Sequence, residues 1–575
     1  MRAAKIQELK LQNYSLPNAW RRTDVLVSSF AINLLALALP VVILQFYDRI
    51  IPYQSDGTFA ALMTGMFIVV CLDLLIKTLR SVILSWESAR FDHQASVDAM
   101  DQILQSDTIT FDAKPAGFYI DRIHALENIQ EFYSGQSILL LIDFPFVLIY
   151  LILIAVIAGP LVWIPLTLLG VFMLVSYKTG GQLHSSLVTR SNMEDRRQNF
   201  VIELLQGIHT AKSMAMESLM LRRYERLQYQ SADSIYDLSK INSISQGIGA
   251  TFSQLAIISF VGVGSIAVVN GSLTVGGLAA GTMLTSRVLQ PGLRAMGVWI
   301  QFQSVRLAIK KVNELFSIPL ESSGDFSCET AVGGKIELRQ LEFGYAKQEK
   351  PLLKNLSLTI QAGETIGITG NNGVGKSTLL SLMSKFLSPD SGTITIDEQP
   401  LDAFNIEFLR SQIGIVPQQG VIFEGTILEN MTLYREGLAA EQAIEIAGKL
   451  GLGEIVSKLP DGLDTYIGGS AAGSLSEGVK QKIVIVRSLV SNPKIILFDD
   501  SNANFDVKND KKLVELIREM KGSRTMVIVS HRPSFLRLCD RVLELHDGEL
   551  RSYQDPFAPP RKEQQKVELK LAGAS

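Results

Sequence analysis

Long apolar blocks alternate with charged, helix-patterned stretches over the first 315 residues of the chain. A helix that spans a bilayer needs roughly 20 largely apolar residues. Six segments meet this requirement, at about 25–47, 58–78, 137–158, 160–178, 247–269 and 274–295. Buried helices of a soluble protein would not be expected to recur with this regularity. The pattern predicts a multi-domain membrane protein in which residues 25–315 form a six-helix transmembrane domain.

The connections between these segments predict which side of the membrane they face. Two connections, 79–136 and 179–246, are long, charged and helical in pattern. Lys and Arg gather in both, at the N-terminus and after the sixth segment, so the positive-inside rule places both chain ends and both connections in the cytoplasm. We expect a short cytoplasmic N-terminus at 1–24, and extended helices that turn near 115–121 and 207–212.

A few ionisable residues interrupt the apolar segments. Such residues are costly in a bilayer and usually face the protein interior or a cavity. Asp73 and Lys77 stand four residues apart, which is a pairing distance on a helix. Asp143 and Arg287 occur in the third and sixth segments, and we interpret them as interior residues that pair with each other. A structural ion pair is a better interpretation than direct contact with a substrate.

Overall composition supports a membrane protein and weakens other classes. Of the 575 residues, 47% are hydrophobic and only 19% are charged, with a mean hydropathy of +0.22. The net charge of −3 gives no reason to expect a nucleic-acid partner. Cys71, Cys328 and Cys539 lie far apart and near no histidine pair, so neither a zinc site nor a disulfide framework is indicated.

The composition changes near residue 335 to that of a soluble α/β domain, which we place at 335–555 after a linker at 316–334. The stretch GNNGVGKST in this domain fits the pattern GxxxxGK[ST] and stands between a strand pattern and a helix pattern. Its glycines let backbone N–H groups approach phosphate oxygens at the positive end of the helix. The predicted nucleotide-binding residues are Gly370, Asn371, Asn372, Gly373, Val374, Gly375, Lys376, Ser377 and Thr378.

Two buried-strand patterns end in polar residues of the kind that handle phosphates. NPKIILFDD ends in Asp499 and Asp500, and TMVIVSHR ends near His531. Because the carboxyl ends of parallel strands share one edge of a sheet, these residues are expected near the phosphate loop. We expect Lys376 to reach the β- and γ-phosphates of ATP, and the Ser377 hydroxyl and Asp499 to hold Mg²⁺.

The order of motifs over residues 20–555 resembles that of ATP-binding cassette (ABC) exporter half-transporters. The match runs from Tyr345 through the phosphate loop, IVPQQ, LSEGV, ILFDD and NANFD to SHR. The resemblance implies the type I ABC exporter fold and a dimer in which two ATP molecules lie between two such domains. It implies that Tyr345 stacks on adenine, and that Gln418 touches Mg²⁺ or water and couples to the membrane part. It also implies that His531 contacts the γ-phosphate.

The same resemblance assigns the remaining site residues. Ser476 and Gly478 of the signature LSEGV would bind the γ-phosphate of the partner's ATP. The implied catalytic set is Asp500, His531, Gln418 and Lys376, and the implied Mg²⁺ ligands are Ser377, Gln418 and Asp499.

Two departures from the family pattern predict weak hydrolysis. The signature is usually LSGGQ, whereas here Glu477 and Val479 replace Gly and Gln. Glu477 either faces the nucleotide and repels it, or points away toward Lys480 or Gln481; the sequence leaves both open. Asp500 stands where the family usually has Glu, and one methylene of misplacement, about 1 Å, can cost on the order of 100-fold in rate.

These departures leave the composition of the dimer open. Asp500 would act on ATP bound by its own chain, whereas Glu477 would act on ATP bound by the partner. A homodimer would carry both departures at both sites, and a heterodimer would separate them.

Three segments of the membrane half resemble type I secretion permease/ATPases, which export RTX-type proteins and large adhesins. They are ILQFYDRIIPYQSDGTFAAL, LIDFPFVLIYLILI and SRVLQPG. We expect no N-terminal peptidase-like domain, because only about 24 residues precede the first span. The resemblance implies a multi-pass protein of the bacterial inner membrane, surrounded by membrane lipid, that works with a periplasmic adaptor and an outer-membrane channel.

Two alternatives remain at this point. One is the same machine moving a lipid, glycan or drug. The other is a nucleotide-binding regulatory subunit of a heteromeric transporter.

Residues 556–575 have the composition of a flexible tail.

Overall fold

The computed structural model describes residues 23–134, 136–327, 332–345, 350–435, 437–468, 475–503 and 505–553. It divides into two compact units, Met1–Leu320 (unit 1) and Glu321–Ser575 (unit 2). The predicted tail at 556–575, and all but the last two residues of the predicted N-terminal segment at 1–24, lie outside the described residues.

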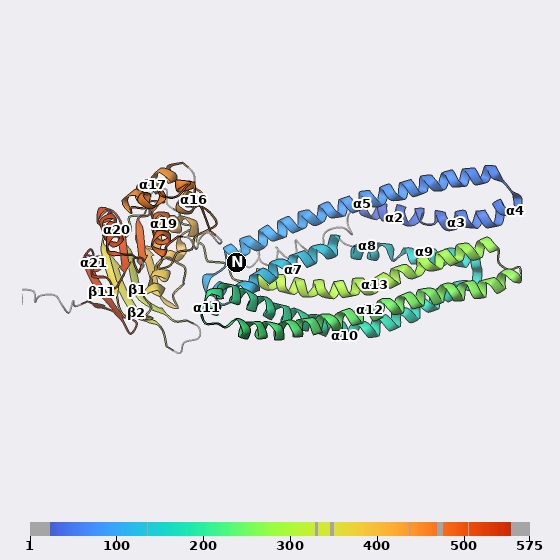
Figure 1. The fold of residues 1–575 in the computed structure, drawn as a ribbon, viewed down its shortest axis with the longest axis horizontal. Helices are drawn as coiled ribbons and strands as arrows, with labels where there is room; N and C mark the ends of the chain where they lie inside the picture. The colour runs from blue at the N-terminus through green and yellow to red at the C-terminus, as the bar shows by residue number, and fades with distance from the viewer. Residues whose placement is uncertain are drawn as a thin grey trace, which may run out of the picture. The chain divides into compact units, whose positions relative to one another are not determined.

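Unit 1 is built from helices, many of them far longer than a bilayer span (Figure 1). Its elements are α2 (Thr23–Leu35), α3 (Ala38–Gln45), η2 (Phe46–Ile50), α4 (Ile51–Tyr53), α5 (Asp56–Leu104), α6 (Thr108–Asp112), α7 (Ala116–Ser134), α8 (Gln136–Asp143), α9 (Phe146–Ala158), η3 (Gly159–Val162), α10 (Trp163–Gln206), α11 (Ile208–Ser213), α12 (Glu217–Val269) and α13 (Val275–Phe316).

Helices occupy all six predicted spans, but length and apolar composition single out four stretches among the described residues. These are Thr23–Tyr53, Asp56–Leu104, Phe146–Val175 and Glu217–Val269. Most of two predicted spans falls in the third stretch, because only the short turn η3 separates α9 from α10. The predicted span at 274–295 lies in α13, outside these four stretches. The number of crossings therefore stays a prediction.

Short helices interrupt the long ones at two points. The turn predicted near 207–212 is confirmed: α10 ends at Gln206 and α11 follows at Ile208–Ser213. The other turn lies earlier than predicted, because α5 already ends at Leu104 and α6 covers Thr108–Asp112. Asp107 caps α6 by accepting a hydrogen bond from the Thr110 N–H, at 3.0 Å.

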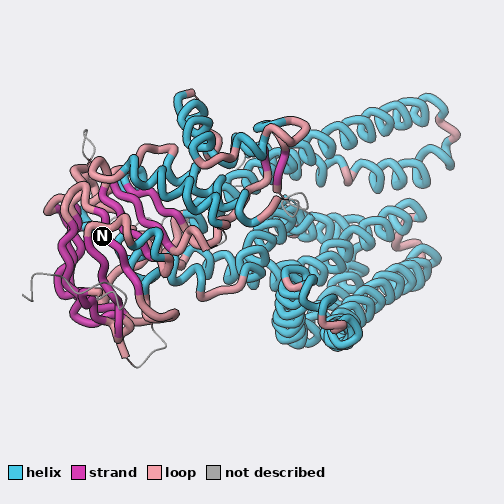
Figure 2. Tube along the Cα trace, turned by 60° about the vertical axis from the view of Figure 1, so that its left-hand side comes forward, coloured by secondary structure: helices cyan, strands magenta, loops and turns pink. Residues whose placement is uncertain are grey.

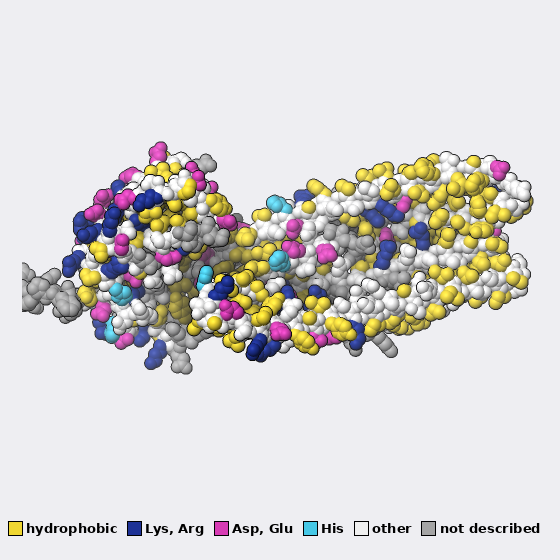
Figure 3. All heavy atoms as spheres, viewed as in Figure 1, with side chains coloured by type: hydrophobic (Ala, Val, Ile, Leu, Met, Phe, Trp, Pro, Cys, Tyr) yellow, Lys and Arg dark blue, Asp and Glu magenta, His cyan; other side chains and the backbone are white. Residues whose placement is uncertain are grey.

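Helix α13 organises the packing of unit 1, since it contacts α3, α7, α9, α10 and α12. Ile154, Phe260 and Leu284 are fully buried where α9, α12 and α13 meet. The approach is close at Gly281, where an added Cβ would lie 2.6 Å from the Phe260 ring. Figure 3 shows hydrophobic side chains over the part of unit 1 that holds α3, α4 and α9, as expected for a surface in contact with lipid.

Ion pairs join three helices of unit 1 outside the predicted spans. Lys311 of α13 bridges Asp121 of α7, at 2.7 Å, and Asp195 of α10, at 3.2 Å. Arg122 contacts Glu314 at 2.8 Å. Burial raises the pKa of the Asp195 carboxyl, while the Lys311 ammonium opposes that shift.

Polar residues inside the predicted spans pair differently from the prediction in one respect. Asp73 and Lys77 form the expected ion pair, at 2.6 Å. Asp143 instead accepts a hydrogen bond from the Asn33 amide, at 2.8 Å, and forms no ion pair with Arg287. The pairing depends on how helices far apart in sequence are rotated, which spacing along the chain does not specify.

Unit 2 contains two larger sheets and flanking helices, coloured magenta and cyan in Figure 2. Its elements are β1 (Ile336–Phe343), β2 (Leu353–Ile360), β3 (Thr365–Thr369), α14 (Lys376–Met383), β4 (Ser391–Ile396), β5 (Gln399–Pro400), η4 (Leu401–Ala403), α15 (Ile406–Gln412), β6 (Ile413–Val416), β7 (Gly425–Thr426), α16 (Ile427–Thr432), α17 (Leu438–Lys449), α18 (Gly453–Val456), η5 (Gly462–Asp464), β8 (Tyr466–Ile467), α19 (Glu477–Leu489), β9 (Ile495–Asp499), α20 (Val507–Met520), β10 (Thr525–Val529), α21 (Pro533–Leu536), β11 (Arg541–His546) and β12 (Glu549–Ser552).

The six-stranded sheet of unit 2 has the order β12-β11-β3-β10-β9-β6. Strands β11, β3, β10, β9 and β6 run parallel, and β12 pairs antiparallel with β11. The second sheet, β2-β1-β4-β5, is antiparallel. Strands β3 and β10 are buried along their whole length, as expected for central strands of a parallel sheet covered on both faces. The carboxyl ends of β3, β10, β9 and β6 therefore meet at one edge.

The close contact at Gly281 gives a stability test within one helix. Gly281→Ala should force Phe260 or the helix backbone to move, and overpacking of this kind typically costs about 1–3 kcal/mol. Gly297 lies in the same helix, and a methyl group added there would have no atom within 4 Å. Gly297→Ala should therefore leave stability equal or raise it by up to about 1 kcal/mol. Thermal unfolding of the purified protein in detergent measures both; an equal melting temperature for the two variants would contradict the packing.

Candidate functional site

The phosphate loop joins the buried strand β3 to helix α14. Gly370, Gly373 and Gly375 have φ values of +144°, +82° and +104°, which favour glycine. A Cβ on Gly370 would lie 2.4 Å from the carbonyl oxygen of Leu545, so the turn also requires a missing side chain. Asn371, Asn372 and Gly373 are exposed, whereas Val374 packs on the core of unit 2. The loop is shaped by its own backbone and leaves its outer rim accessible.

The Lys376 ammonium is held over the phosphate loop. Its Nζ donates hydrogen bonds to the carbonyl oxygens of Gly370, at 2.7 Å, and Asn371, at 2.8 Å. Partial burial lowers the pKa of Lys376, and the carboxylates of Asp500 and Asp499 oppose this shift. A cation stabilised only by loop carbonyls and nearby acids is well placed to exchange these partners for phosphate oxygens.

Ser377 and Asp499 bring oxygen ligands together at the start of α14 and the end of β9. The Ser377 hydroxyl lies close enough to the Asp499 carboxyl to influence its pKa. Burial raises the pKa of the Asp499 carboxyl and the Asp500 charge adds to this shift, while the nearby Ser377 hydroxyl and the Lys376 charge oppose it. Mg²⁺ is usually held by one or two protein oxygens together with substrate phosphates. The pair fits that ion, and among the described residues no group of three or more His, Cys, Asp or Glu side chains forms a separate metal site.

Asp500 is fixed by the backbone directly after β9. Its φ of +42° lies in the left-handed region, which Asp tolerates better than most residues. Its N–H donates a 2.9 Å hydrogen bond to the carbonyl oxygen of Val529, at the end of β10. The carboxylate lies close enough to influence the pKa of Lys376. The backbone of Asp500 is therefore constrained, and this limits where its side chain can lie near the phosphate loop.

Gln418 and His531 follow β6 and β10, at the same edge of the parallel sheet. Both are exposed, and neither forms a hydrogen bond or ion pair with another residue of the described ranges. The sheet brings them to the side of the phosphate loop, but the structure shows no contact between either residue and Lys376 or Asp499.

Tyr345 lies two residues after β1, in the antiparallel sheet. Its hydroxyl is 3.2 Å from Thr378 Oγ1 on α14, and its ring meets Phe343 edge-on, with centroids 5.1 Å apart. The side chain is 40% exposed. An aromatic face of this kind beside the phosphate loop can stack on a nucleotide base.

The signature segment resolves one of the open alternatives. Glu477 forms an ion pair with Lys480, at 2.8 Å, one turn along α19. Ser476 is the N-cap of α19, but its hydroxyl makes no capping hydrogen bond, and Gly478 lies in the first turn. Val479 is only 7% exposed and packs in the core. The replacement of the usual Gln by Val is therefore an internal change.

Two connections near the site were not predicted from the sequence. Arg532 donates hydrogen bonds to the carbonyl oxygens of Ala503 and Phe505 and to the carboxylate of Asp510, each at 3.1 Å. It thus ties the segment after His531 to the NANFD loop. Gln481 of α19 donates to the carbonyl of Pro417, at 2.8 Å, next to Gln418. The sequence signal for the Arg532 contacts was that Arg532 directly follows His531, a predicted site residue.

Comparison with protein families covers both units. The model of the ABC transporter transmembrane region matches residues 25–291, and the ABC transporter model matches residues 353–503. A solved structure of a bacterial Atm1-family ABC exporter with ATP bound has a TM-score of 0.82 at 21% identity, covering 96% of this chain and 99% of the other.

Curated relatives match nearly the whole chain at low identity. The Alpha-hemolysin translocation ATP-binding protein HlyB of Escherichia coli O157:H7 is 28% identical over 529 residues. The match covers 91% of this chain and 74% of that protein. The Cyclolysin secretion/processing ATP-binding protein CyaB of Bordetella pertussis is 27% identical, and the Leukotoxin export ATP-binding protein LtxB of Aggregatibacter actinomycetemcomitans is 26% identical; each match covers 92% of this chain and 74% of the relative. With a transmembrane unit of exporter fold and an α/β nucleotide-binding unit in one polypeptide, this chain belongs to the ABC transporters, as an exporter half-transporter that couples ATP hydrolysis to export.

Proposed function

We propose that this chain drives export of a polypeptide across the bacterial inner membrane by the type I secretion route. The observation that carries this proposal is the match over more than nine-tenths of the chain to proteins named for hemolysin translocation, cyclolysin secretion and leukotoxin export. The membrane segments ILQFYDRIIPYQSDGTFAAL and SRVLQPG, which resemble those of type I secretion permease/ATPases, agree with it. We infer both termini to be cytoplasmic, and a periplasmic adaptor and an outer-membrane channel to be the partners.

The geometry of unit 2 supports separate roles for its residues in binding the phosphates, the Mg²⁺ ion and the adenine of ATP. The phosphate loop, from Gly370 to Thr378, would bind the phosphates through its N–H groups and Lys376. Ser377 and Asp499, which lie near each other at the start of α14 and the end of β9, would hold Mg²⁺, which neutralises phosphate charge when bound. Tyr345 would stack on the adenine.

The remaining assignments concern hydrolysis. Asp500 would orient the attacking water, and His531 and Gln418 would approach the γ-phosphate side from neighbouring strands. Asp500 is shorter than the usual Glu and is held by its backbone hydrogen bond to Val529. A constrained, short side chain cannot easily recover the missing reach, so we infer slow hydrolysis with ATP binding retained.

We infer a dimer, with Ser476 and Gly478 of one chain facing the ATP of the other. The Ser476 hydroxyl is not used in capping α19, which leaves it available for a phosphate. The Glu477–Lys480 ion pair weakens the objection that Glu477 repels the nucleotide. The structure therefore favours a homodimer more than the sequence does. Of the departures from the family pattern, only Asp500 would still be expected to impair both ATP sites of a homodimer.

Loss of ATP binding should stop export of a polypeptide. In cells that naturally carry the chain, Lys376→Ala should remove one or a few proteins from the culture medium, since the loop would lack its phosphate-binding cation. Quantitative mass spectrometry of the medium measures this. Lys458→Ala, an exposed site in the same unit, is the matched control and should change nothing. An unchanged set of secreted proteins with altered lipid, glycan or drug content would contradict polypeptide export.

The burial of Val479 predicts that restoring the usual signature residue is harmful. Val479→Gln would place a carboxamide in an apolar core, at a cost of about 1–3 kcal/mol when its hydrogen bonds are not met. For a unit of this size that lowers the melting temperature by about 2–4 °C per kcal/mol. Glu477→Gln, at an exposed position, should shift it little. Thermal unfolding of the two variants measures this difference in melting temperature. Faster ATP turnover by Val479→Gln at an unchanged melting temperature would contradict the burial of Val479 and show that it faces the nucleotide.

A further inference from the structure

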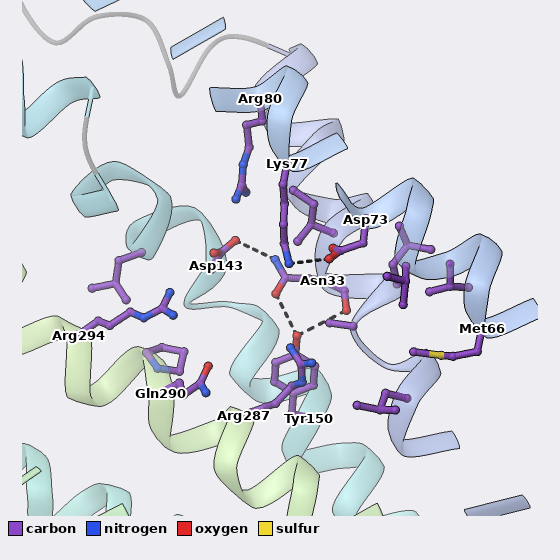
Figure 4. Close-up of a pocket in the computed structure, with 18 residues that line it drawn as sticks. Asn33, Met66, Asp73, Lys77, Arg80, Asp143, Tyr150, Arg287, Gln290 and Arg294 are labelled. Carbon is purple, nitrogen blue, oxygen red and sulfur yellow. Dashed lines mark hydrogen bonds and ion pairs between the residues drawn. The ribbon is translucent and has the colours of Figure 1, made fainter. Parts of the chain in front are cut away.

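A cavity of about 420 Å³ lies within unit 1 among α2, α5, α8, α9 and α13 (Figure 4). Its volume falls in the range of sites that bind small ligands or a few side chains. Six charged side chains line it: Asp73, Lys77, Arg80, Asp143, Arg287 and Arg294. Four are cationic and two are acidic, so the lining carries a formal net charge of +2.

Both acids of the cavity are already engaged. Asp73 pairs with Lys77, at 2.6 Å. Asp143 accepts a hydrogen bond from the Asn33 amide, at 2.8 Å, and the side-chain carbonyl oxygen of Asn33 accepts one from the Tyr150 hydroxyl, at 3.0 Å. This bonded set fixes Asp143 on the side of the cavity that faces α2, away from a direct pairing with α13 (Figure 4).

The two arginines of α13 are left without such partners. Among the residues that the structure describes, neither Arg287 nor Arg294 has an ion pair or a hydrogen bond from its guanidinium. Arg294 interacts with the Asp143 carboxylate only electrostatically, without a direct contact. Both side chains are directed at the cavity from one helix, seven residues apart, which places them on the same face.

Unpaired guanidinium groups in a segment predicted to cross a membrane are expensive unless water or an anion compensates them. The planar guanidinium matches a carboxylate with two parallel hydrogen bonds. The excess of positive charge and the free donors on α13 therefore point to a ligand with a negatively charged oxygen group.

The other groups on this face favour a peptide over a phosphate ester. Gln290 lies between the two arginines, is exposed to the cavity and has no hydrogen-bond partner among the described residues. Its carboxamide can donate to a carbonyl and accept from an N–H. Pro291 has no N–H to donate to the carbonyl oxygen of Arg287, which leaves that oxygen an acceptor without its usual helical partner. A peptide backbone offers both donors and acceptors, whereas an ionised phosphate diester only accepts.

We propose that this cavity binds a carboxylate-bearing segment of the exported polypeptide, with Arg287 and Arg294 on the carboxylate and Gln290 on the adjoining peptide group. The proposal rests on polypeptide export as the function and adds a preference for acidic segments at this point of the membrane unit. Asn33 and Tyr150 act as positioning residues, because they keep Asp143 from neutralising the arginines.

The test measures binding of a short fluorescein-labelled peptide of alternating Glu and Gly to the full chain in phosphatidylcholine nanodiscs, by fluorescence anisotropy. The wild-type chain should bind it, and should bind the matched Gln–Gly peptide at least about tenfold more weakly, as expected for loss of one charged hydrogen-bonded contact. Arg287→Gln with Arg294→Gln should weaken binding of the Glu peptide by about tenfold or more.

Three controls keep the result interpretable. Arg306→Gln makes the same change on α13 at an exposed position outside the cavity, and should leave the dissociation constant within about twofold of wild type. Arg287→Lys with Arg294→Lys should retain part of the affinity, because the charge remains. Unchanged thermal unfolding of the glutamine variant excludes loss of fold.

Several outcomes would overturn the inference. Equal affinity for the Glu and Gln peptides, or no effect of the glutamine variant, would remove carboxylate recognition while leaving polypeptide export intact. Displacement of the Glu peptide by phosphatidylglycerol in the nanodisc, lost in the glutamine variant, would assign the cavity to a lipid phosphate. The proposed function is tested separately by the proteins that Lys376→Ala removes from the medium, so the two can fail independently.

Discussion

The parallel pairing of β3, β10 and β9 is the constraint on which the nucleotide-binding unit depends. It places the phosphate loop, which follows β3, at the same edge as the end of β9, two strands away in the sheet, with β10 between them. Because these strands are parallel, the pairing also aligns the segments that carry Asp500 and His531. The N–H of Asp500, which has a positive φ, donates to the carbonyl oxygen of Val529 at the end of β10 and so links the ends of β9 and β10. The residues that we propose for phosphate binding, metal binding and hydrolysis therefore lie at one edge of the sheet.

Local chemistry explains why the phosphate site could be predicted and other contacts could not. Glycines at positive φ and a lysine at fixed spacing form a loop within nine residues, so the sequence alone indicates it. The Arg532–Asp510 contact depends on packing between different segments of the chain. Glu477 had two possible neighbours on its own helix, and spacing alone did not show that it pairs with Lys480. In unit 1, apolar runs predicted helices correctly, but the rotation that joins Asp143 to Asn33 arises from helix packing. Pro115 is a strong turn signal in the sequence, yet the chain already turns before it, at the short helix Thr108–Asp112.

The membrane unit shows how polar groups are accommodated among apolar helices. Asp73 and Lys77 form an ion pair at 2.6 Å, and Asn33 links Asp143 to Tyr150 at 2.8 and 3.0 Å. Among the residues of the cavity that the structure describes, Arg287 and Arg294 of α13 are the charged side chains without such a partner. In the nucleotide-binding unit the exception is a carboxylate of unusual length at a constrained position. Both exceptions lie where the structure is open to a ligand. The helices and strands around them are packed and hydrogen-bonded in the ordinary way.

The most direct measurement of the central claim is the ATPase rate of the purified chain in lipid, beside Asp500→Glu. If this chain is an ATP-driven exporter whose hydrolysis is limited by the reach of Asp500, the wild-type rate is low, abolished by Lys376→Ala, and raised by about 10- to 100-fold in Asp500→Glu. A fast wild-type rate that Asp500→Glu leaves unchanged or lowers would contradict this account, and would show that the shorter carboxylate is already correctly placed.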